Sequence, residues 1–467
     1  MPLGLFRRRP PATPELEPAA PEAVDPSAAP LFPMRPPATA IAEPPPIAAP
    51  RPIPIRPLPE FQAPEVATAI TPAPAPAPES EPAPAPPVSI GPRLPHGPML
   101  DDLVTDGRAL AAIELHKQSI LTRPDPFHAE PMVDGVSAFA DEFTDPARRV
   151  SEPEASRLVA LDDVVVLGRD GISIWRDQIL FHSMLSVEAW RQESRIAQAD
   201  DQGSLVLKAP VDNIVPVAGP LLMGFVGAWM NYAHWMTECL PRAFAFLVLR
   251  QREPAVRLIV PNLPADGPQM ETLRWLGITP EQLYVLHDNQ AIRAAKLWCV
   301  SGVGGGHPPV LVRAAALHLS AAIPLDLNEA EGLVANRVYI HRGMATRRLV
   351  NFEELRPVLD RFGFNVVRMH DFGAQTQVRL MRNARHVIGE NSGGLSNVMF
   401  CRRGARLLEL NNPAFPHPAH WALMGLVGGG YGFCVGRHVG DGVPNMNSDY
   451  SIPAEDFSRA VEALVAA

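Results

Sequence analysis

Crowded prolines at the N-terminus limit most strongly what this chain can fold into. Of the 54 prolines among its 467 residues, 31 lie before residue 99, in repeated units such as PAPAPAPES. A segment of this kind has few bulky side chains to bury, so folding could not offset its loss of conformational entropy. We therefore predict a disordered Pro/Ala-rich tail over residues 1–97 that acts as a spacer or tether. A docking ligand for a proline-reading module is the alternative.

Composition places the remaining residues in the ordinary globular class, with enough length to bury two cores of typical domain size. The net charge is -9 and no long basic run occurs, which argues against a nucleic-acid partner. The four cysteines are widely spaced and form no CxxC pair, which argues against both a zinc site and a disulfide framework. A reducing compartment fits this pattern.

The apolar, uncharged segment Ile214 to Met230 is a candidate membrane span. It falls short of the ~20 residues that a spanning helix needs, and prolines and glycines interrupt it repeatedly. We expect buried strands that feed a helix instead. The N-terminal arginines precede no apolar stretch, so no secretory signal is predicted. A cytoplasmic protein is expected, with peripheral attachment to the inner face of the plasma membrane left open.

Residues 98–326 are predicted to form a first α/β domain. Its beginning, to about Gln202, has an irregular pattern apart from a hairpin signal, in which Arg169-Asp170-Gly171 separates two β-rich runs. Strands and helices then alternate, which predicts a parallel sheet covered by helices. The expected strands are 256–260, 283–286 and 297–300, and the expected helices are 270–276 and 310–323.

Residues 327–467 are predicted to form a second α/β domain after an interdomain hinge at Asp326 to Glu331. Asn351 and Glu354 form an N-cap and capping-box pair, and Gly363 ends the helix that they open. The fold class is therefore α/β, with two Rossmann-like domains and ligands at the carboxyl ends of the strands. The expected strands are 337–341, 365–369, 386–389 and 406–410; helices are expected at 352–362, 375–383, from Leu395 and at 453–465.

The segment VIGENSGGLSNVMF is the sharpest local signal. An apolar strand runs into Ser392-Gly393-Gly394, and a helix begins directly afterwards. Glycines let the backbone approach a ligand closely, and the positive end of a helix suits a phosphate. Tight packing between the strand and the helix would explain the same glycines. We expect the stretch Val387 to Leu410 to hold a diphosphate.

Charged residues near two other strand ends support a phosphate site. Arg342, Arg347 and Arg348 occupy the loop after one strand, and guanidinium groups bind phosphate oxygens bidentately. The alternative is a solvated basic loop. Glu409 ends an apolar strand, where a carboxylate can accept hydrogen bonds from ribose hydroxyls or form a strand-end salt bridge. N-capping accounts for Asn351 fully.

The segment MNYAHWMTECLPRAF places four polar side chains three or four residues apart, which puts them on one helix face. His234 and Glu238 are the catalytic candidates, because a histidine and a carboxylate can deprotonate an acceptor hydroxyl. We expect Glu238, paired with His234, to be the general base. Asn231 and Arg242 are the acceptor-side candidates. Pro241 is expected to kink or restart the helix. A satisfied core histidine is the alternative reading.

A second glycine cluster, SGVGGGHPP at Ser301 to Pro309, invites a dinucleotide interpretation. It lacks the GxGxxG spacing, and Pro308-Pro309 interrupt the helix start that such a site needs. We therefore reject a dinucleotide site here, and a Rossmann-type oxidoreductase remains a minor alternative.

Taken together, these motifs resemble glycosyltransferase family 61. The family's N-[YF]-x-H-W segment and Leu-Pro-Arg correspond to Asn231–Trp235 and Leu240–Arg242. Its arginine-rich stretch ending in Asn, its GF-V-V strand, its Gln-containing helix and its G-x-H-G-A-x-L-T-N turn follow in the same order, the last as Gly389 to Asn397. Asn391 stands where many members have His, and Ser392 stands for the usual Gly.

The resemblance implies a GT-B-like fold and inverting transfer of a sugar from a nucleotide-sugar donor, with no obligatory metal and no further cofactor. It implies a glycan or lipid-linked glycan acceptor, and work on capsular or extracellular polysaccharide in bacterial relatives. A non-catalytic nucleotide-sugar-binding or scaffold protein of a polysaccharide assembly complex is the alternative. The donor-binding residues that it implies are Arg342, Arg347, Arg348, Asn391, Ser392, Gly393, Gly394, Asn397 and Glu409.

Overall fold

A computed structural model describes the part of the chain that carries these motifs, and all of its described residues lie in one compact unit, Ala83–Ala467. The described ranges are 93–94, 99–117, 121–130, 143, 149–151, 155–168, 170–180, 197–199, 205–207, 211, 213–302, 310–323, 336–343, 346–415 and 417–466. The expected tail apart from 93–94, the hinge at 326–331 and most of the second glycine cluster therefore lie outside the described residues.

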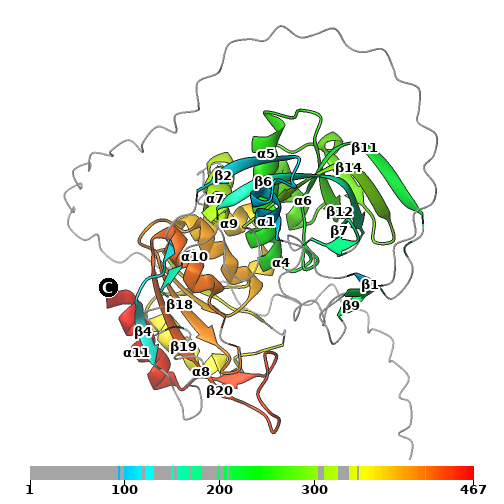
Figure 1. Ribbon diagram of the computed structural model, residues 1–467. Helices are drawn as coiled ribbons and strands as arrows, with labels where there is room; N and C mark the ends of the chain where they lie inside the picture. The colour runs from blue at the N-terminus through cyan, green and yellow to red at the C-terminus, as the bar shows by residue number, and fades with distance from the viewer. Residues whose placement is uncertain are drawn as a thin grey trace, which may run out of the picture. The chain divides into compact units, whose positions relative to one another are not determined.

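The first large sheet has eight strands and mixes parallel and antiparallel pairing (Figure 1). Its parallel part follows the order β13-β12-β11-β14, and β14 then pairs antiparallel with β6. The expected alternation of strands and helices is thus confirmed for the parallel part. The bounds are β13 Leu283–Leu286, β12 Arg257–Pro261, β11 Ile214–Met223, β14 Ala291–Val300, β6 Ser156–Leu167, β7 Ser173–Trp175, β8 Gln178–Ile179 and β2 Ala111–His116.

Strand β6 corrects the expectation of an irregular region before residue 202. It is a twelve-residue strand whose side chains are buried on both faces over most of its length. Its sequence therefore lacks the alternation of apolar and polar residues that predicts a half-buried strand. The predicted hairpin at its end is confirmed, because β6 and β7 pair antiparallel across Gly171. Gly171 has a φ of 63°, which glycine adopts without steric cost.

Strand β11 accounts for the apolar segment that resembled a membrane span. It is followed by a turn and then by helix α4 (Tyr232–His234), so the predicted strand feeding a helix is confirmed. Leu221, Leu222 and Met223 at its carboxyl end are fully buried. Among the residues that the structure describes, no helix is both long enough and apolar enough to cross a membrane.

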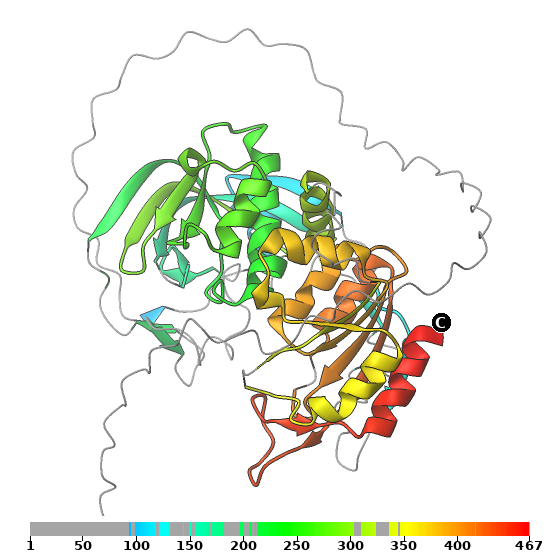
Figure 2. The same ribbon diagram turned by 180° about the vertical axis from the view of Figure 1, so that it is seen from behind.

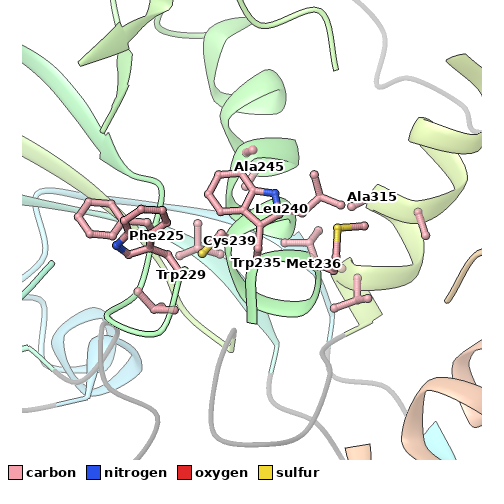
Figure 3. Close-up of a cluster of buried hydrophobic side chains, with 14 of the residues drawn as sticks. Phe225, Trp229, Trp235, Met236, Cys239, Leu240, Ala245 and Ala315 are labelled. Carbon is pink, nitrogen blue, oxygen red and sulfur yellow. The ribbon is translucent and has the colours of Figure 1, made fainter. Parts of the chain in front are cut away.

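Helices on the first sheet bury one shared apolar core. The helices are α5 Leu240–Arg250, α6 Pro268–Trp275 and α7 Val310–Ala322. Trp235, Met236 and Leu240 pack in one cluster with Phe225 of the turn after β11 and Ala315 of α7, as Figure 3 shows. The tryptophan of the His-Trp pair is therefore a core residue, and its Nε1 donates to Thr272 Oγ1 at 3.0 Å.

The second large sheet has six strands, all parallel, in the order β16-β15-β17-β18-β19-β4 (Figures 1 and 2). Its last strand comes from the segment that we assigned to the first domain. Phe127 of β4 fills the space above Gly432, where a Cβ would lie 2.6 Å from the ring. The bounds are β16 Asn365–Val367, β15 Arg337–Ile340, β17 His386–Glu390, β18 Arg406–Asn411, β19 Gly430–Val435 and β4 Pro126–Glu130.

Helices cover both faces of this sheet. Helices α8 (Phe352–Arg361) and α11 (Ala454–Ala466) share a core on one face, coloured yellow and red in Figure 2. Helices α9 (Ala374–Asn383), α10 (Ala419–Val427) and η6 (Gly393–Phe400) bury their apolar sides in the other core.

The order of the strands reverses at β15. From β15 the chain continues to β16 on one side of this strand and then crosses to β17 on its other side. Such a switch point favours ligand binding at the carboxyl ends.

The predicted short helix after the glycine turn is confirmed, and it is of the 3-10 type. The predicted capping role of Asn351 needs correction. Asn351 occupies the N-cap position of α8, but its side chain does not cap the helix. It instead bonds both backbone groups of Ile452, at 2.8 and 3.1 Å, because the end of the chain passes close to the start of α8.

Short elements complete the described part of the chain. They are β1 Arg93–Leu94, α1 Leu100–Thr105, β3 Leu121–Thr122, β5 Val150–Ser151, β9 Ala197–Ala199, β10 Leu205–Leu207, η2 Trp235–Cys239, η3 Pro280–Gln282, η5 Met369–Asp371, β20 Arg437–His438 and β21 Tyr450–Ser451.

Candidate functional site

The predicted catalytic helix is a continuous run of α4, η2 and α5 with a π-helical turn in its middle. Leu240 N–H donates to Trp235 O, five residues back, and Pro241, which has no N–H, follows at once in the first turn of α5. Pro241 therefore restarts the helix, which is one of the two outcomes, kink or restart, that the sequence predicts. Single π turns are frequent at functional sites.

His234 and Glu238 form the pair that the sequence predicts. His234 Nδ1 lies 2.7 Å from Glu238 Oε1. The histidine side chain is 31% exposed, whereas the carboxylate is 8% exposed. Glu238 Oε2 is buried and has no hydrogen-bond partner in the described ranges. The carboxylate is thus placed to orient the imidazole, and the imidazole is the member of the pair that reaches the surface.

Arg242 does not join the acceptor side. It is fully buried, and its Nη1 donates to the Glu238 backbone carbonyl at 2.9 Å. Burial lowers the pKa of Arg242, while the charges of Cys239 and Glu238 act in the opposite direction. The expectation of an acceptor contact is corrected here, because the π turn and Pro241 rotate this residue into the core behind Glu238.

The start of the catalytic helix packs against the glycine turn. Asn231 caps α4, and its Oδ1 accepts from Ala233 N at 2.9 Å. A Cβ on Gly393 would lie 3.5 Å from both of these atoms. The two sharpest sequence motifs, 165 residues apart at Tyr232 and Asn397, therefore meet in space.

A buried hydrogen-bond chain fixes this contact. Tyr232 OH donates to Asn397 Oδ1 at 2.8 Å, and Asn397 Nδ2 donates to Gln377 Oε1 at 2.7 Å. Gln377 Nε2 in turn donates to the carbonyls of Met369 and Phe372. Asn397 is fully buried, so it joins the two halves of the site, and the expected contact with a donor is corrected.

Packing explains two of the glycines in the turn. A Cβ on Gly389 would lie 2.5 Å from Leu395 Cδ1, and one on Gly394 would lie 3.1 Å from the Met369 side chain. The packing alternative therefore holds at these two positions. Gly393 and Ser392 are both partly exposed and remain the surface of the turn that a ligand can approach.

Two arginines and Asn391 form a cationic cluster beside the turn. Arg342 Nη1 donates to Asn391 O at 2.6 Å, and Arg347 Nη1 donates to Asn391 Oδ1 at 2.7 Å. Burial lowers the pKa of Arg347 to about 10, and the charge of Arg342 adds to the shift. Burial also lowers the pKa of Arg342. Neither Nε atom has a hydrogen-bond partner among the described residues. An anion bound here would reduce the repulsion between the two arginines and accept hydrogen bonds from them.

Arg347 is held in an unusual backbone conformation. Its φ is 64°, a left-handed value that is uncommon for a residue other than glycine. Its N–H donates to Asn447 O at 3.0 Å, and its guanidinium lies 4.1 Å above the Phe415 ring. Such strain persists where the surroundings fix it, often at functional sites.

Arg348, in contrast, points away from this cluster. It is exposed, and its Nε and Nη2 lie 2.9 and 2.5 Å from Asp449 Oδ2. This ion pair raises the pKa of Arg348 and lowers the pKa of Asp449. The solvated-loop alternative therefore describes Arg348, and the expected phosphate contact is corrected for this residue.

Glu409 lies behind Asn391 and does not reach the surface. It is fully buried. Its Oε1 accepts from Asn391 Nδ2 at 2.7 Å and pairs with His420 Nδ1 at 2.8 Å, and its Oε2 accepts from Tyr431 OH at 2.8 Å. Since both oxygens are engaged, the expected ribose contact is corrected to a positioning role toward Asn391.

His417 is a site residue that the sequence interpretation missed. Its ring stacks on Phe415 with the ring centroids 5.5 Å apart, and the guanidinium of Arg347 lies over the same Phe415 ring. Burial lowers the pKa of His417 to about 4, and the nearby His420, His234 and Arg347 add to the shift, against the opposing charge of Glu409. His234 and Arg347 thus both lie close enough to His417 to act on it electrostatically. No spacing rule marks His417, which lies six residues beyond the end of β18.

His341 and Glu390 were also missed. The two side chains pair across neighbouring strands, with His341 Nδ1 at 2.6 Å from Glu390 Oε1. Both residues lie at the carboxyl ends of strands that the sequence predicts. This position was the signal that could have identified them as site residues. Over the described ranges, no group of three or more His, Cys, Asp or Glu side chains is arranged to hold a metal ion.

Comparison with known proteins supports one family. Residues 232–408 match the family model described as Glycosyltransferase 61, a stretch that runs from the start of α4 into β18. The match supports this family and, with it, glycosyltransferase activity. No curated protein matches the chain.

Proposed function

We propose that the protein is an inverting, metal-independent glycosyltransferase that moves a sugar from a nucleotide-sugar donor to a glycan acceptor. The observation that carries this proposal is the contact between the start of α4 and the glycine turn at Gly393. Asn391, which Arg342 and Arg347 both bond, lies two residues before Gly393, and this closeness supports one site for the His234–Glu238 pair and the two arginines. A proton acceptor and a cationic cluster are the two parts that such a transfer needs.

The donor diphosphate would lie against the cationic cluster. The partly buried Arg342 and the buried Arg347 have lowered pKa values and unmet Nε donors, and together they form a site with a strong preference for an anion. Ser392 and Gly393 form the exposed backbone beside them. These groups would neutralise the charge that develops on the leaving nucleoside diphosphate, the task that a metal ion performs in other transferases.

The acceptor hydroxyl would enter beside His234. Its oxygen attacks the anomeric carbon while the bond from that carbon to the diphosphate oxygen breaks, and the bonding electrons leave with the diphosphate. His234 takes the hydroxyl proton at Nε2, because Glu238 engages Nδ1. We therefore assign the proton acceptor to His234 and a positioning role to Glu238. One displacement inverts the configuration at the anomeric carbon.

The proposal also covers the arrangement of the domains and the cellular role of the protein. Residues 98–326 and 327–467 would act as two Rossmann-like domains in a GT-B-like arrangement, with β4 exchanged into the second sheet. The family match supports a nucleotide-sugar donor and a glycan acceptor. We place the reaction in capsular or extracellular polysaccharide synthesis, in the cytoplasm and at the inner face of the plasma membrane, with a lipid-linked glycan as acceptor.

A ligand panel tests the proposal. Thermal unfolding would be followed with nucleoside diphosphates and nucleotide sugars, because a ligand that binds the native state raises its stability by mass action. We expect one nucleotide series to stabilise the wild type and to stabilise Arg347→Gln much less. Stabilisation without sugar transfer to any acceptor would indicate a non-catalytic binding protein. No stabilisation by any member of the panel would contradict the proposed function.

A further inference from the structure

A second histidine–carboxylate pair lies at the switch point of the parallel sheet. His341 directly follows β15, and Glu390 is the last residue of β17. These strands are neighbours, with Ile340 opposite Gly389, and the strand order reverses at β15. The pair therefore sits where a parallel α/β sheet offers its ligand site.

The pair has one buried and one accessible member. Glu390 is 1% exposed, and its Oε1 lies 2.6 Å from His341 Nδ1 and 3.0 Å from the Tyr339 hydroxyl, which donates to it. The His341 side chain is 22% exposed and stacks on Phe352 at 4.4 Å. These contacts fix the ring plane and engage Nδ1. Nε2 is the nitrogen that remains for a ligand.

Glu390 lacks full compensation for its buried charge. Its Oε2 is buried and makes no hydrogen bond to any residue that the structure describes. A buried carboxylate with an unmet acceptor is costly unless a cation stands next to it. A protonated His341 is the nearest group that can supply this charge, since Nδ1 already contacts Oε1.

The groups around His341 belong to the donor side of the site. The next residue is Arg342, whose guanidinium bonds Asn391 O and interacts electrostatically with Glu390 and Tyr450. Tyr339 faces the pair from β15, and Phe352 faces it from α8, with Arg356 beyond that ring at 6.0 Å. Arg342 and Arg356 are cationic, whereas α8 also carries Glu353 and Glu354 in its first turn beside Phe352. The two arginines are the groups here that can attract an anion toward His341.

We propose that His341, positioned by Glu390, is a third cationic contact for the donor diphosphate, and that His341 takes up a proton when the diphosphate binds. The proton comes from the buffer and adds to the Nε2 lone pair, and no other bond forms or breaks. The imidazolium then donates from Nε2 to a diphosphate oxygen and from Nδ1 to Glu390. This inference rests on the proposed function and adds the coupling between donor binding and protonation.

Titration calorimetry with inorganic pyrophosphate tests the inference. Binding to the full chain would be measured at one pH in two buffers with different ionisation enthalpies, which gives both the affinity and the number of protons taken up. We expect His341→Gln to bind about tenfold more weakly, the usual loss for one charge-assisted hydrogen bond, and to take up fewer protons than the wild type. Protonation changes of pyrophosphate itself are common to both proteins and cancel in the comparison.

Glu390→Gln separates a positioning role from a merely structural one. The amide keeps an oxygen toward His341 and Tyr339 but removes the charge that favours the imidazolium. We expect proton uptake to fall in this variant while His341 is still present. His318→Gln, an exposed histidine on α7, is the matched control and should leave affinity and proton uptake unchanged. If His341→Gln fails to fold, His341→Asn replaces it, since asparagine also offers a donor to Glu390.

The outcomes distinguish this inference from the proposed function. If Arg347→Gln loses pyrophosphate affinity while His341→Gln keeps both affinity and proton uptake, the role of His341 is refuted and the donor site stands. If the wild type does not bind pyrophosphate, or Arg347→Gln binds it as well as the wild type does, the donor site itself is refuted together with the inference.

Discussion

Loss of the Tyr232 hydroxyl should weaken the contact that joins the two halves of the site. Tyr232 OH donates to Asn397 Oδ1 at 2.8 Å, and Asn397 is fully buried. Tyr232→Phe leaves that oxygen without a donor, because the other Asn397 contact uses Nδ2 toward Gln377. An unsatisfied buried acceptor costs about 1–3 kcal/mol, so we expect the free energy of unfolding to fall by about this amount.

Urea denaturation of the wild type and of Tyr232→Phe would give this difference. Tyr284→Phe is the matched control, because the Tyr284 ring contacts Arg257 through its face and keeps that contact without the hydroxyl. A double-mutant cycle with Asn397→Leu should show a coupling energy of about 1 kcal/mol or more. Equal unfolding free energies for the two phenylalanine variants, or an additive cycle, would refute the reasoning.

Two further variants probe individual site residues. Burial lowers the pKa of His417 to about 4, below the ~6.5 of an unfolded chain, so between these values the unfolded state binds a proton that the folded state does not. The free energy of unfolding of the wild type should therefore fall as the pH drops through this window. Between pH 7 and pH 5, His417→Gln should lose about 2 kcal/mol less of this free energy than the wild type, as measured by urea unfolding at the two pH values. Arg348→Gln should leave pyrophosphate affinity within about threefold of the wild type in calorimetry, because Asp449 engages Arg348 outside the cationic cluster; a tenfold loss would return this residue to the donor site.

Sequence patterns predicted the elements that hold the site. Strands β15, β16, β17 and β18 and helices α8, α9, η6 and α11 follow from apolar runs separated by turn residues, and the structure places them close to the expected bounds. Strands β4 and β19 and helix α10 were not predicted. Local propensity and periodicity suffice for the predicted elements because each depends on neighbouring residues alone. The motifs around His234 and Gly393 were each predicted to belong to the site, and the structure brings them into contact at Asn231.

Long-range burial accounts for the expectations that needed correction. Arg242, Asn397 and Glu409 are polar residues in motifs, but each is fully buried and hydrogen-bonded to other parts of the protein. Periodicity cannot show whether a polar side chain turns toward a ligand or toward a buried partner. The same limit hid the His341–Glu390 pair, which forms through strand pairing.

Asn391 illustrates how a departure from a family pattern can keep its chemistry. Its Oδ1 accepts from Arg347, and its Nδ2 donates to Glu409. A neutral imidazole also offers one acceptor and one donor, so the asparagine preserves the hydrogen-bond polarity that a histidine would provide. The departure is therefore compatible with an intact cationic cluster.

Release of nucleoside diphosphate from a panel of nucleotide sugars, with and without glycan acceptors, tests the central claim most directly. We expect the wild type to release the diphosphate from one donor series and to form a glycoside of inverted configuration. We expect His234→Ala to lower kcat by about 10²–10⁴-fold, as for loss of a general base, and Arg347→Gln mainly to raise the KM for the donor. Full turnover by His234→Ala, or retention of configuration in the product, would contradict this claim.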